Sequence, residues 1–347
     1  MHGGPSGPPC FLKSQESDLQ LPFSPLRSAF NGALRRGEQR DERKEGKCMS
    51  HMKKQSLAKQ LRPYLWLLPS IILMSVLILI PIITVFQTSM CEISRVGVNR
   101  GFVAFKNYIA IFHNPVFWNT LKNTLIWTVV VVGVSTLFGF VLAMVLNQKF
   151  HGRKIARAIV VFPWATALVI QSVIWKYIIN ADYGALNLLL SKLGIIDEYI
   201  NWTATASQIF AWECWVGIFV TVPFVTFCVL SGLQSIDTTL YEAADVDGAN
   251  FWDKLFKITL PLVMPSLTVS TVLNIIYVFN SFPIIWTISK GAPADKTHTL
   301  VTYLYQLQFI DGKGGEAAAV SVIGFIILSI CASIYMVLSL RAEKREG

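Results

Sequence analysis

The sequence has few charged residues for its length, and this scarcity excludes an ordinary soluble domain. Only 15% of the 347 residues are Asp, Glu, Lys or Arg, whereas 53% are hydrophobic. A soluble domain averages about 25% charged residues, which cover its surface toward water. The net charge of +9 does not indicate nucleic-acid binding, because Lys and Arg also gather in the cytoplasmic loops of membrane proteins.

Several chemical sites are missing from the sequence as well. No G-x-x-x-x-G-K-[ST] phosphate loop is present, so the chain cannot hydrolyse ATP by that route. His113, His151 and His298 fall in different predicted loops, which argues against a membrane enzyme. The cysteines show neither a CxxC pair nor metal-ligand spacing, so we predict no disulfide framework and no metal site. The six cysteines are Cys10, Cys48, Cys91, Cys214, Cys228 and Cys331.

Six apolar runs dominate the remainder of the chain. About 20 residues of helix cover a hydrocarbon core of roughly 30 Å. The runs do not alternate as barrel strands would, and backbone groups in lipid must be paired internally. We therefore predict an all-α membrane protein with six transmembrane helices, in which Pro163, Pro223 and Pro283 are tolerated inside runs. The predicted spans are Tyr64–Phe86, Asn123–Leu146, Ala158–Ile179, Gln208–Leu230, Met264–Trp286 and Ala317–Leu340.

The ends of the spans predict an orientation in the membrane. More Lys and Arg residues flank one side than the other, including the cluster Arg153, Lys154 and Arg157. This side is expected to be cytoplasmic, with both termini inside.

The first 60 residues have a different composition from the rest. They are rich in Pro, Gly, Ser and charge, and they contain no apolar stretch of signal-peptide length. Such a segment buries too little apolar area to offset its chain entropy, so we expect it to be disordered. Met52 and the two lysines after it resemble an ordinary start. Residues 1–51 are therefore expected to be a dispensable tail or an upstream misreading of the start codon.

The longest predicted cytoplasmic connection joins the fourth and fifth spans, over residues 231–263. Asp237 can cap a short helix, and Asp247-Gly248 allows a turn that a residue with a Cβ would resist. A second helix is predicted to end near Pro261 and Pro265. Its apolar residues at helical spacing are Phe251, Leu255, Ile258 and Leu262.

This helix–turn–helix suits the docking of a partner protein. Small alanines permit close approach, the apolar stripe supplies buried area, and Glu242 offers one charge to a partner's Arg or Lys. The alternative is an amphipathic loop that rests on lipid headgroups.

The spacing Glu242-Ala243-Ala244, Asp247-Gly248-Ala249, Phe256, Ile258 and Leu260-Pro261 is similar to a known signature. It resembles the EAA loop of the membrane-spanning subunits of bacterial binding-protein-dependent ABC importers. The resemblance implies a type I importer core of five transmembrane helices over residues 115–347, with an added helix and outer loop over 61–114. The residues that it implies for ATPase coupling are Tyr241, Glu242, Ala243, Ala244, Asp247, Gly248, Ala249, Phe256, Leu260 and Pro261.

The same resemblance implies the partners and the location. A dimeric cytoplasmic ATPase would hold ATP and Mg, while this chain would bind no cofactor itself. A second permease subunit, different in sequence from this one, and an extracytoplasmic solute-binding protein would complete the importer. The assembly would lie in the bacterial plasma membrane as a multi-pass protein.

Segments around the last two spans resemble permeases for sugars. These segments are Phe279-Asn280-Ser281-Phe282-Pro283, Lys290-Gly291-Ala292-Pro293 and Asp311-Gly312, although sugar permeases usually have Gly-Gly-Pro in the second. Another solute, such as glycerol 3-phosphate or a polyamine, is the alternative. An ion-coupled carrier is less favoured, because such carriers place charged residues inside the membrane, and the spans here contain almost none.

Sugar rings are bound by aromatic platforms beside neutral amides and hydroxyls. Residues of these types in the spans are candidates for the substrate path, although helix packing through interhelical hydrogen bonds is the more ordinary role. Glu213 is expected to reach headgroups or water near the outer face. Trp127, Trp164, Trp175 and Trp286 are expected to anchor span ends at the interface. The candidates for the substrate path are Asn274, Tyr277, Asn280, Ser281, Gln171 and Glu213.

Overall fold

The computed structural model describes residues 57–346. The expectations for the N-terminal tail therefore concern residues that lie almost wholly outside the described part of the chain. The chain divides into two units, residues 1–78 and 79–347. The division falls within helix α2 (Leu57–Ser89), which contains the first predicted span. Helices α5 and α6, described below, form a bent pair that can count as one span. The described residues hold five helices that are long and apolar enough to cross a membrane, or six if this pair is included.

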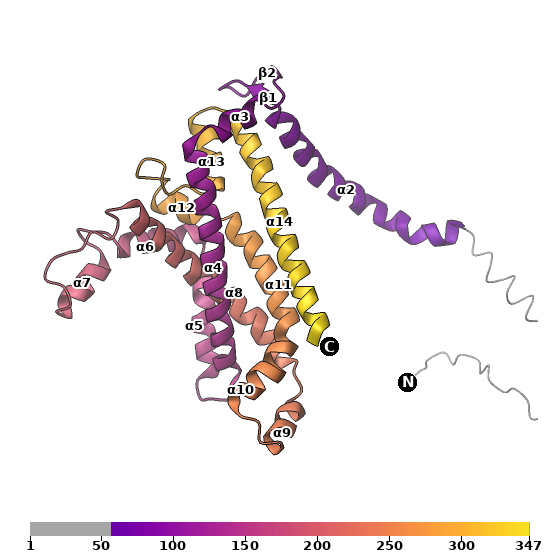
Figure 1. The fold of residues 1–347 in the computed structure, drawn as a ribbon, viewed down its shortest axis with the longest axis vertical. Helices are drawn as coiled ribbons and strands as arrows, with labels where there is room; N and C mark the ends of the chain where they lie inside the picture. Colours follow the sequence, from indigo (N-terminus) through magenta and orange to yellow (C-terminus); the bar gives the residue numbers. More distant parts are fainter. Residues whose placement is uncertain (1–56, 347) are drawn as a thin grey trace, which may run out of the picture. The chain divides into compact units, whose positions relative to one another are not determined.

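Four long helices form the centre of the second unit (Figure 1): α4 (Pro115–Asn147), α8 (Ala206–Gln234), α11 (Leu260–Phe279) and α14 (Gly314–Glu346). Helix α8 packs against α4 and α11, and α11 also packs against α14. Local sequence sets the starts of two of these helices. Asn114 caps α4 through Val116 N, and Thr205 forms a capping box with Gln208 at the start of α8.

The third predicted span is not a continuous helix, so the prediction of Ala158–Ile179 as one span is wrong in its middle. Helix α5 (Arg153–Ala165) and helix α6 (Leu168–Ile178) meet at an angle of 96°. Gln171 Nε2 donates a hydrogen bond of 2.5 Å to the carbonyl of Pro163, which stabilises the bend. Hydropathy reports that a run is apolar, but it does not report where the run changes direction.

The fifth predicted span is also divided. Helix α11 ends at Phe279, and the short helix α12 (Pro283–Ile288) begins with Pro283 in its first turn. A proline at that position needs no N–H partner, so Pro283 starts a helix instead of interrupting one. Pro223, by contrast, does lie inside a helix, in α8.

Small elements lie at the end of this unit where α4 begins. Strands β1 (Cys91–Ile93) and β2 (Asn99–Phe102) pair antiparallel, with Cys91 opposite Phe102 and Ile93 opposite Asn99. Three short elements lie with them: α3 (Lys106–Phe112), α13 (Leu300–Tyr305) and the π-helical turn η2 (Gln306–Ile310). Helix α7 (Ala185–Lys192) lies elsewhere, against α6.

The connection between α12 and α13 is tied to helix α4. Asn123 Nδ2 donates to the carbonyls of Lys296 at 2.7 Å and His298 at 3.1 Å. The side chain of His298 is buried, with Nδ1 3.1 Å from Thr302 Oγ1. Burial lowers the pKa of His298 below its ordinary value, so the ring stays neutral near pH 7.

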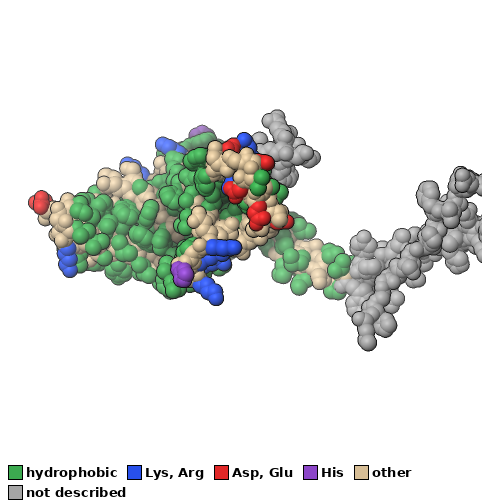
Figure 2. Space-filling model, turned by 90° about the horizontal axis from the view of Figure 1, so that it is seen from below, with side chains coloured by type: hydrophobic (Ala, Val, Ile, Leu, Met, Phe, Trp, Pro, Cys, Tyr) green, Lys and Arg blue, Asp and Glu red, His purple; other side chains and the backbone are tan. Residues whose placement is uncertain are grey.

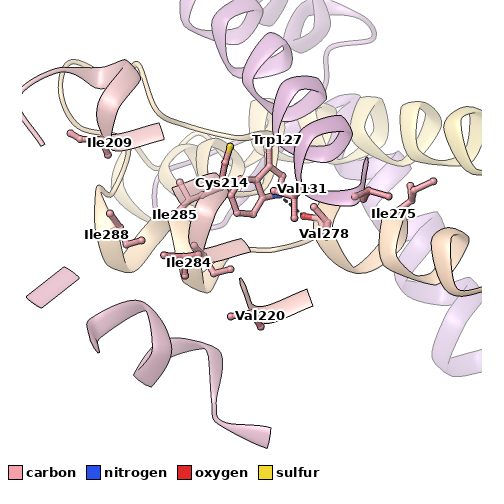
Figure 3. Packing of buried hydrophobic residues seen from close by; sticks show 12 residues of the cluster. Trp127, Val131, Ile209, Cys214, Val220, Ile275, Val278, Ile284, Ile285 and Ile288 are labelled. Carbon is pink, nitrogen blue, oxygen red and sulfur yellow. Dashed lines mark hydrogen bonds between the residues drawn. The ribbon is translucent and has the colours of Figure 1, made fainter. Parts of the chain in front are cut away.

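The centre of the core is built around Trp127 (Figure 3). Its indole N–H donates to the carbonyl of Val278 at 2.8 Å, and the side chain is only 1% exposed. Ile284 and Ile285 of α12 and Cys214 of α8 pack in the same cluster. The expectation that Trp127 anchors the membrane interface is therefore wrong. The sequence gives the depth of a tryptophan along a helix, but not the face from which it projects.

Three glycines bring α8 close to its neighbours. A Cβ on Gly217 of α8 would lie 2.7 Å from the Trp127 ring, and a Cβ on Gly139 of α4 would lie 2.7 Å from Val225 of α8. A Cβ on Gly232 would lie 2.8 Å from Ser266 Cβ of α11. These contacts exclude any larger residue unless the helices separate.

Two glycines of α4 provide a matched test of this packing. We expect Gly139→Ala to lower the free energy of unfolding by about 1–3 kcal/mol, because the new methyl group overpacks the contact with Val225. Gly133→Ala is the control, because among the described residues nothing lies within 4 Å of a Cβ at that position. Thermal unfolding of the purified protein in detergent compares the two variants, and equal midpoints would contradict the prediction.

Candidate functional site

The connection between α8 and α11 folds into short helices at the end of the unit opposite the β1–β2 hairpin (Figure 1). Helix α9 (Thr238–Val246) begins after Asp237, whose carboxylate accepts a hydrogen bond from Thr239 N at 3.0 Å. This hydrogen bond from the backbone holds the pKa of Asp237 below its ordinary value. The predicted helix cap at Asp237 is confirmed.

Helix α9 ends in a tight turn at Asp247 and Gly248. Gly248 has φ of +75°, the left-handed region that favours glycine. The N–H of Gly248 donates to Asp245 O at 3.1 Å, and the N–H of Ala249 donates to Ala244 O at 2.9 Å, which closes the end of the helix. The predicted turn is confirmed.

The second helix of the loop does not end at the prolines, contrary to prediction. Helix α10 (Phe251–Lys254) continues through a π-helical turn, η1 (Leu255–Thr259), directly into α11. Pro261 occupies the first turn of α11, and Pro265 lies inside that helix. The wider turn of η1 lets the chain continue past a residue that has no N–H to donate.

Two interactions hold α9 against the start of α11. Thr259 Oγ1 donates to Lys254 O at 3.0 Å and lies 3.0 Å from the hydroxyl of Tyr241. Because the Thr259 proton is used, Tyr241 acts as the donor in the second hydrogen bond. Lys254 also forms an ion pair with Asp245 of α9. Helix α9 is therefore fixed to the start of helix α11.

The outer surface of the loop is both apolar and acidic. Among its apolar side chains, Val246 is 89% exposed, and Trp252 and Phe256 stack with ring centroids 6.0 Å apart. Glu242 and Asp247 are exposed beside them. Seen from this end, acidic side chains gather close to Lys and Arg side chains (Figure 2). An exposed apolar surface with charged residues around it is typical of a protein interaction site.

The structure places the polar residues of α11 in different surroundings. Asn274 is fully buried, and its Nδ2 donates to Ser135 Oγ of α4 at 2.9 Å, which joins two helices. Tyr277 is 45% exposed. Asn280 is exposed and donates to Ile276 O at 2.8 Å. Ser281 is buried beyond the end of the helix. These side chains do not form one surface.

Glu213 lies on α8, the helix that packs against α12, and it has no exposed surface. The expectation that it reaches headgroups or water is wrong, because the protein itself covers the side chain. Ser289 approaches the carboxyl group, but neither oxygen has a hydrogen bond of ordinary geometry in the described part of the chain.

Within residues 57–346, no hydrogen bond joins any two of the six candidates for the substrate path. Gln171, the remaining candidate, stabilises the bend after α5.

Several residues that hold the loop together were not found from the sequence. The sequence does not indicate that Thr259 pairs with Tyr241, because the two residues are 18 positions apart and Thr259 lies in an apolar run. Asp245 and Lys254 lie on opposite sides of the Gly248 turn. Whether their side chains meet depends on the geometry of that turn, which the sequence does not show. The opposite charges nine residues apart were the one available signal.

Comparisons with known proteins agree on one family. Residues 135–345 match the family described as "Binding-protein-dependent transport system inner membrane component". A probable ABC transporter permease protein of Brucella suis biovar 1 is 43% identical, over 81% of this chain and 98% of the relative. The sulfoquinovosyl glycerol transport system permease protein SmoG of Agrobacterium fabrum is 35% identical, over 79% and 89%. The trehalose/maltose transport system permease protein MalF of Thermococcus litoralis is 32% identical, over 79% and 92%.

The fold is similar to that of a solved structure. It is a chain of a bacterial ABC transporter involved in the import of the acidic polysaccharide alginate. The TM-score is 0.73 at 22% identity, covering 82% of this chain and 98% of the other. The prediction of an all-α membrane protein with the core of a type I ABC importer permease is confirmed.

Tyr241→Phe tests how α9 is held. The substitution removes one hydrogen bond worth about 1 kcal/mol, so we expect the α9 amides to exchange their hydrogens about five-fold faster. Hydrogen exchange followed by mass spectrometry makes the measurement. Tyr277→Phe is the control, because no hydrogen bond of the Tyr277 hydroxyl is found in the described residues. Equal exchange of α9 in both variants would contradict the prediction.

Proposed function

Because the chain belongs to the family of binding-protein-dependent transport system inner membrane components, we propose that it is the permease subunit of an ATP-driven importer of a sugar or oligosaccharide. Members of this family are membrane-spanning transport subunits and not enzymes. The solute would arrive on an extracytoplasmic binding protein. The ATPase would be a separate dimeric subunit that holds ATP and Mg.

The observation that carries this proposal is the exposed loop formed by α9 and α10. Its outer surface presents Glu242 and the aromatic pair Trp252 and Phe256 to a partner. Its inner side is fixed to α11 through Tyr241 and Thr259. A partner that moves α9 would therefore also move the long helices α8 and α11.

Each proposed coupling residue has a role that fits this geometry. Ala243 is exposed, and with its partially buried neighbour Ala244 it would let the ATPase surface approach α9 closely. Asp247 and Gly248 form the turn that reverses the chain, and Ala249 closes it. Leu260 and Pro261 begin α11, the helix that would receive the motion.

The sugar specificity is supported by the names of two relatives. SmoG is named for sulfoquinovosyl glycerol, and MalF for trehalose and maltose. Tyr277 and Asn280 are exposed near the end of α11, so they are the substrate-path candidates that a solute could reach without rearrangement of the core.

The orientation remains a proposal that the charge distribution supports. The basic cluster at the start of α5 and Lys254 and Lys257 lie at the same end of the unit as α9. With this end in the cytoplasm, α9 would face the ATPase, and both chain termini would lie on the cytoplasmic side of a bacterial plasma membrane.

Substitutions at two exposed positions of the loop test the coupling role. We expect Glu242→Lys and Gly248→Pro to leave membrane insertion intact but to lower uptake at least ten-fold. The first reverses a docking charge, and the second places a residue that cannot adopt φ of +75°. Gly248→Asn is the control, because asparagine tolerates this region, and it should retain most of the uptake.

Uptake by a strain that lacks the chain, complemented with each variant, provides the measurement. A panel of labelled neutral and acidic oligosaccharides supplies the solutes, and co-purification of the ATPase with the tagged chain reports docking. Unaltered uptake and ATPase association in both variants would refute the coupling role. Loss of glycerol 3-phosphate or polyamine uptake in the deletion strain, with uptake of every sugar retained, would refute the sugar assignment.

A further inference from the structure

Two arginines at the start of α5 meet the ends of two other helices. Arg153 Nε donates to the carbonyl of Leu146 at 2.7 Å, and Arg157 Nη2 donates to the same oxygen at 3.3 Å. Gln234 is the last residue of α8. In the amide orientation that satisfies its hydrogen bonds, its oxygen accepts from Arg157 Nη2 at 2.6 Å and from Arg153 Nη2 at 3.3 Å.

The charges of these arginines are not balanced by acidic side chains. Among the described residues, no carboxylate lies within 4.0 Å of either guanidinium group. The groups lie instead at the C-terminal ends of α4 and α8, where unpaired carbonyls and the helix dipole favour positive charge. The planar guanidinium can bond two acceptors at once, which a lysine cannot do in the same geometry.

One donor in this arrangement is unused. The Nε of Arg157 is buried and has no hydrogen-bond partner in the described part of the chain. A buried donor without a partner is unfavourable, so this N–H is available to a further acceptor.

These residues lie between the loop and an apolar hollow that the long helices line. Gln234 lies three residues before Asp237, the cap of α9. Beyond the arginines, α4, α5 and α8 line an apolar hollow of about 840 Å³. Ile155 and Phe162 line it from α5, and Phe219 lines it from α8. The arginines therefore lie between the loop and this hollow.

We infer that Arg153, Arg157 and Gln234, which we call the arginine clasp, are positioning residues that transmit displacement of α9 to helix α5. The inference rests on the proposed function. When the ATPase moves α9, α8 moves with it, and the clasp draws the start of α5 along. Because α5 ends at the bend before α6, the angle between α5 and α6 then changes in step with the ATPase.

The test measures the distance between α5 and α6 in the complete importer. The complex is purified through a tag on this chain, in a variant whose six cysteines are replaced. Spin labels are placed at Ile155 of α5 and Ile174 of α6, both of which are exposed. Distances between the labels are measured without nucleotide and with ATP, Mg and vanadate.

In the complex with an intact clasp, we expect vanadate trapping to shift this distance. Gln234→Leu should reduce the shift to less than half. Arg157→Lys should give an intermediate value, because lysine keeps the charge but cannot donate to both acceptors in the geometry of the guanidinium group. Gln234 is exposed at a helix end, so its substitution should not prevent folding. Lys154→Leu is the control, because it removes an exposed neighbouring charge outside the clasp and should retain the full shift.

The outcomes separate this inference from the proposed function. A full shift in Gln234→Leu, with the ATPase still bound, overturns the clasp and leaves the proposed function intact. Loss of ATPase binding in Gln234→Leu also overturns it, since the residue would then act in docking. A complex with an intact clasp that binds the ATPase but shows no shift overturns the clasp as well. Failure of the chain to co-purify with any ATPase instead overturns the proposed function.

Discussion

Backbone groups that leave a helix in apolar surroundings must find a partner, and this requirement underlies the whole structure. Three irregular points in the bundle are each paired with a polar side chain from another helix. Gln171 pairs with the carbonyl of Pro163 at the bend after α5, and Trp127 pairs with Val278 near the end of α11. Asn123 holds the connection before α13. The few polar residues of the spans are therefore largely occupied in shaping the bundle.

The same requirement explains how the loop at α9 is held to the long helices. The end of α8 and the start of α11 are both fixed by polar contacts, through Gln234 on one side and Thr259 on the other. The apolar side chains on the outer surface of the loop, by contrast, are exposed. A coupling element needs a surface that can bind a partner protein and that is fixed to the long helices.

Features set by adjacent residues could be predicted from the sequence. The cap at Asp237 and the turn at Gly248 depend on local chemistry, and both were placed correctly. Features set by the third dimension could not be predicted. Trp127 and Glu213 were assigned to the membrane interface because their depth along a helix was known, while the face on which they lie was not. The functional roles of the loop and the substrate path remain predictions, since they depend on molecules outside this chain.

The close contacts of the glycines Gly139, Gly217 and Gly232 have a consequence for motion. At each contact the backbone of one helix touches a side chain of the next without a gap. Helices α4, α8 and α11 therefore cannot rotate separately, and they form one rigid body. The bend between α5 and α6 lies outside these contacts, so it is where the unit can deform. A displacement at the loop would therefore move α4, α8 and α11 together, and the bend between α5 and α6 would take up the difference.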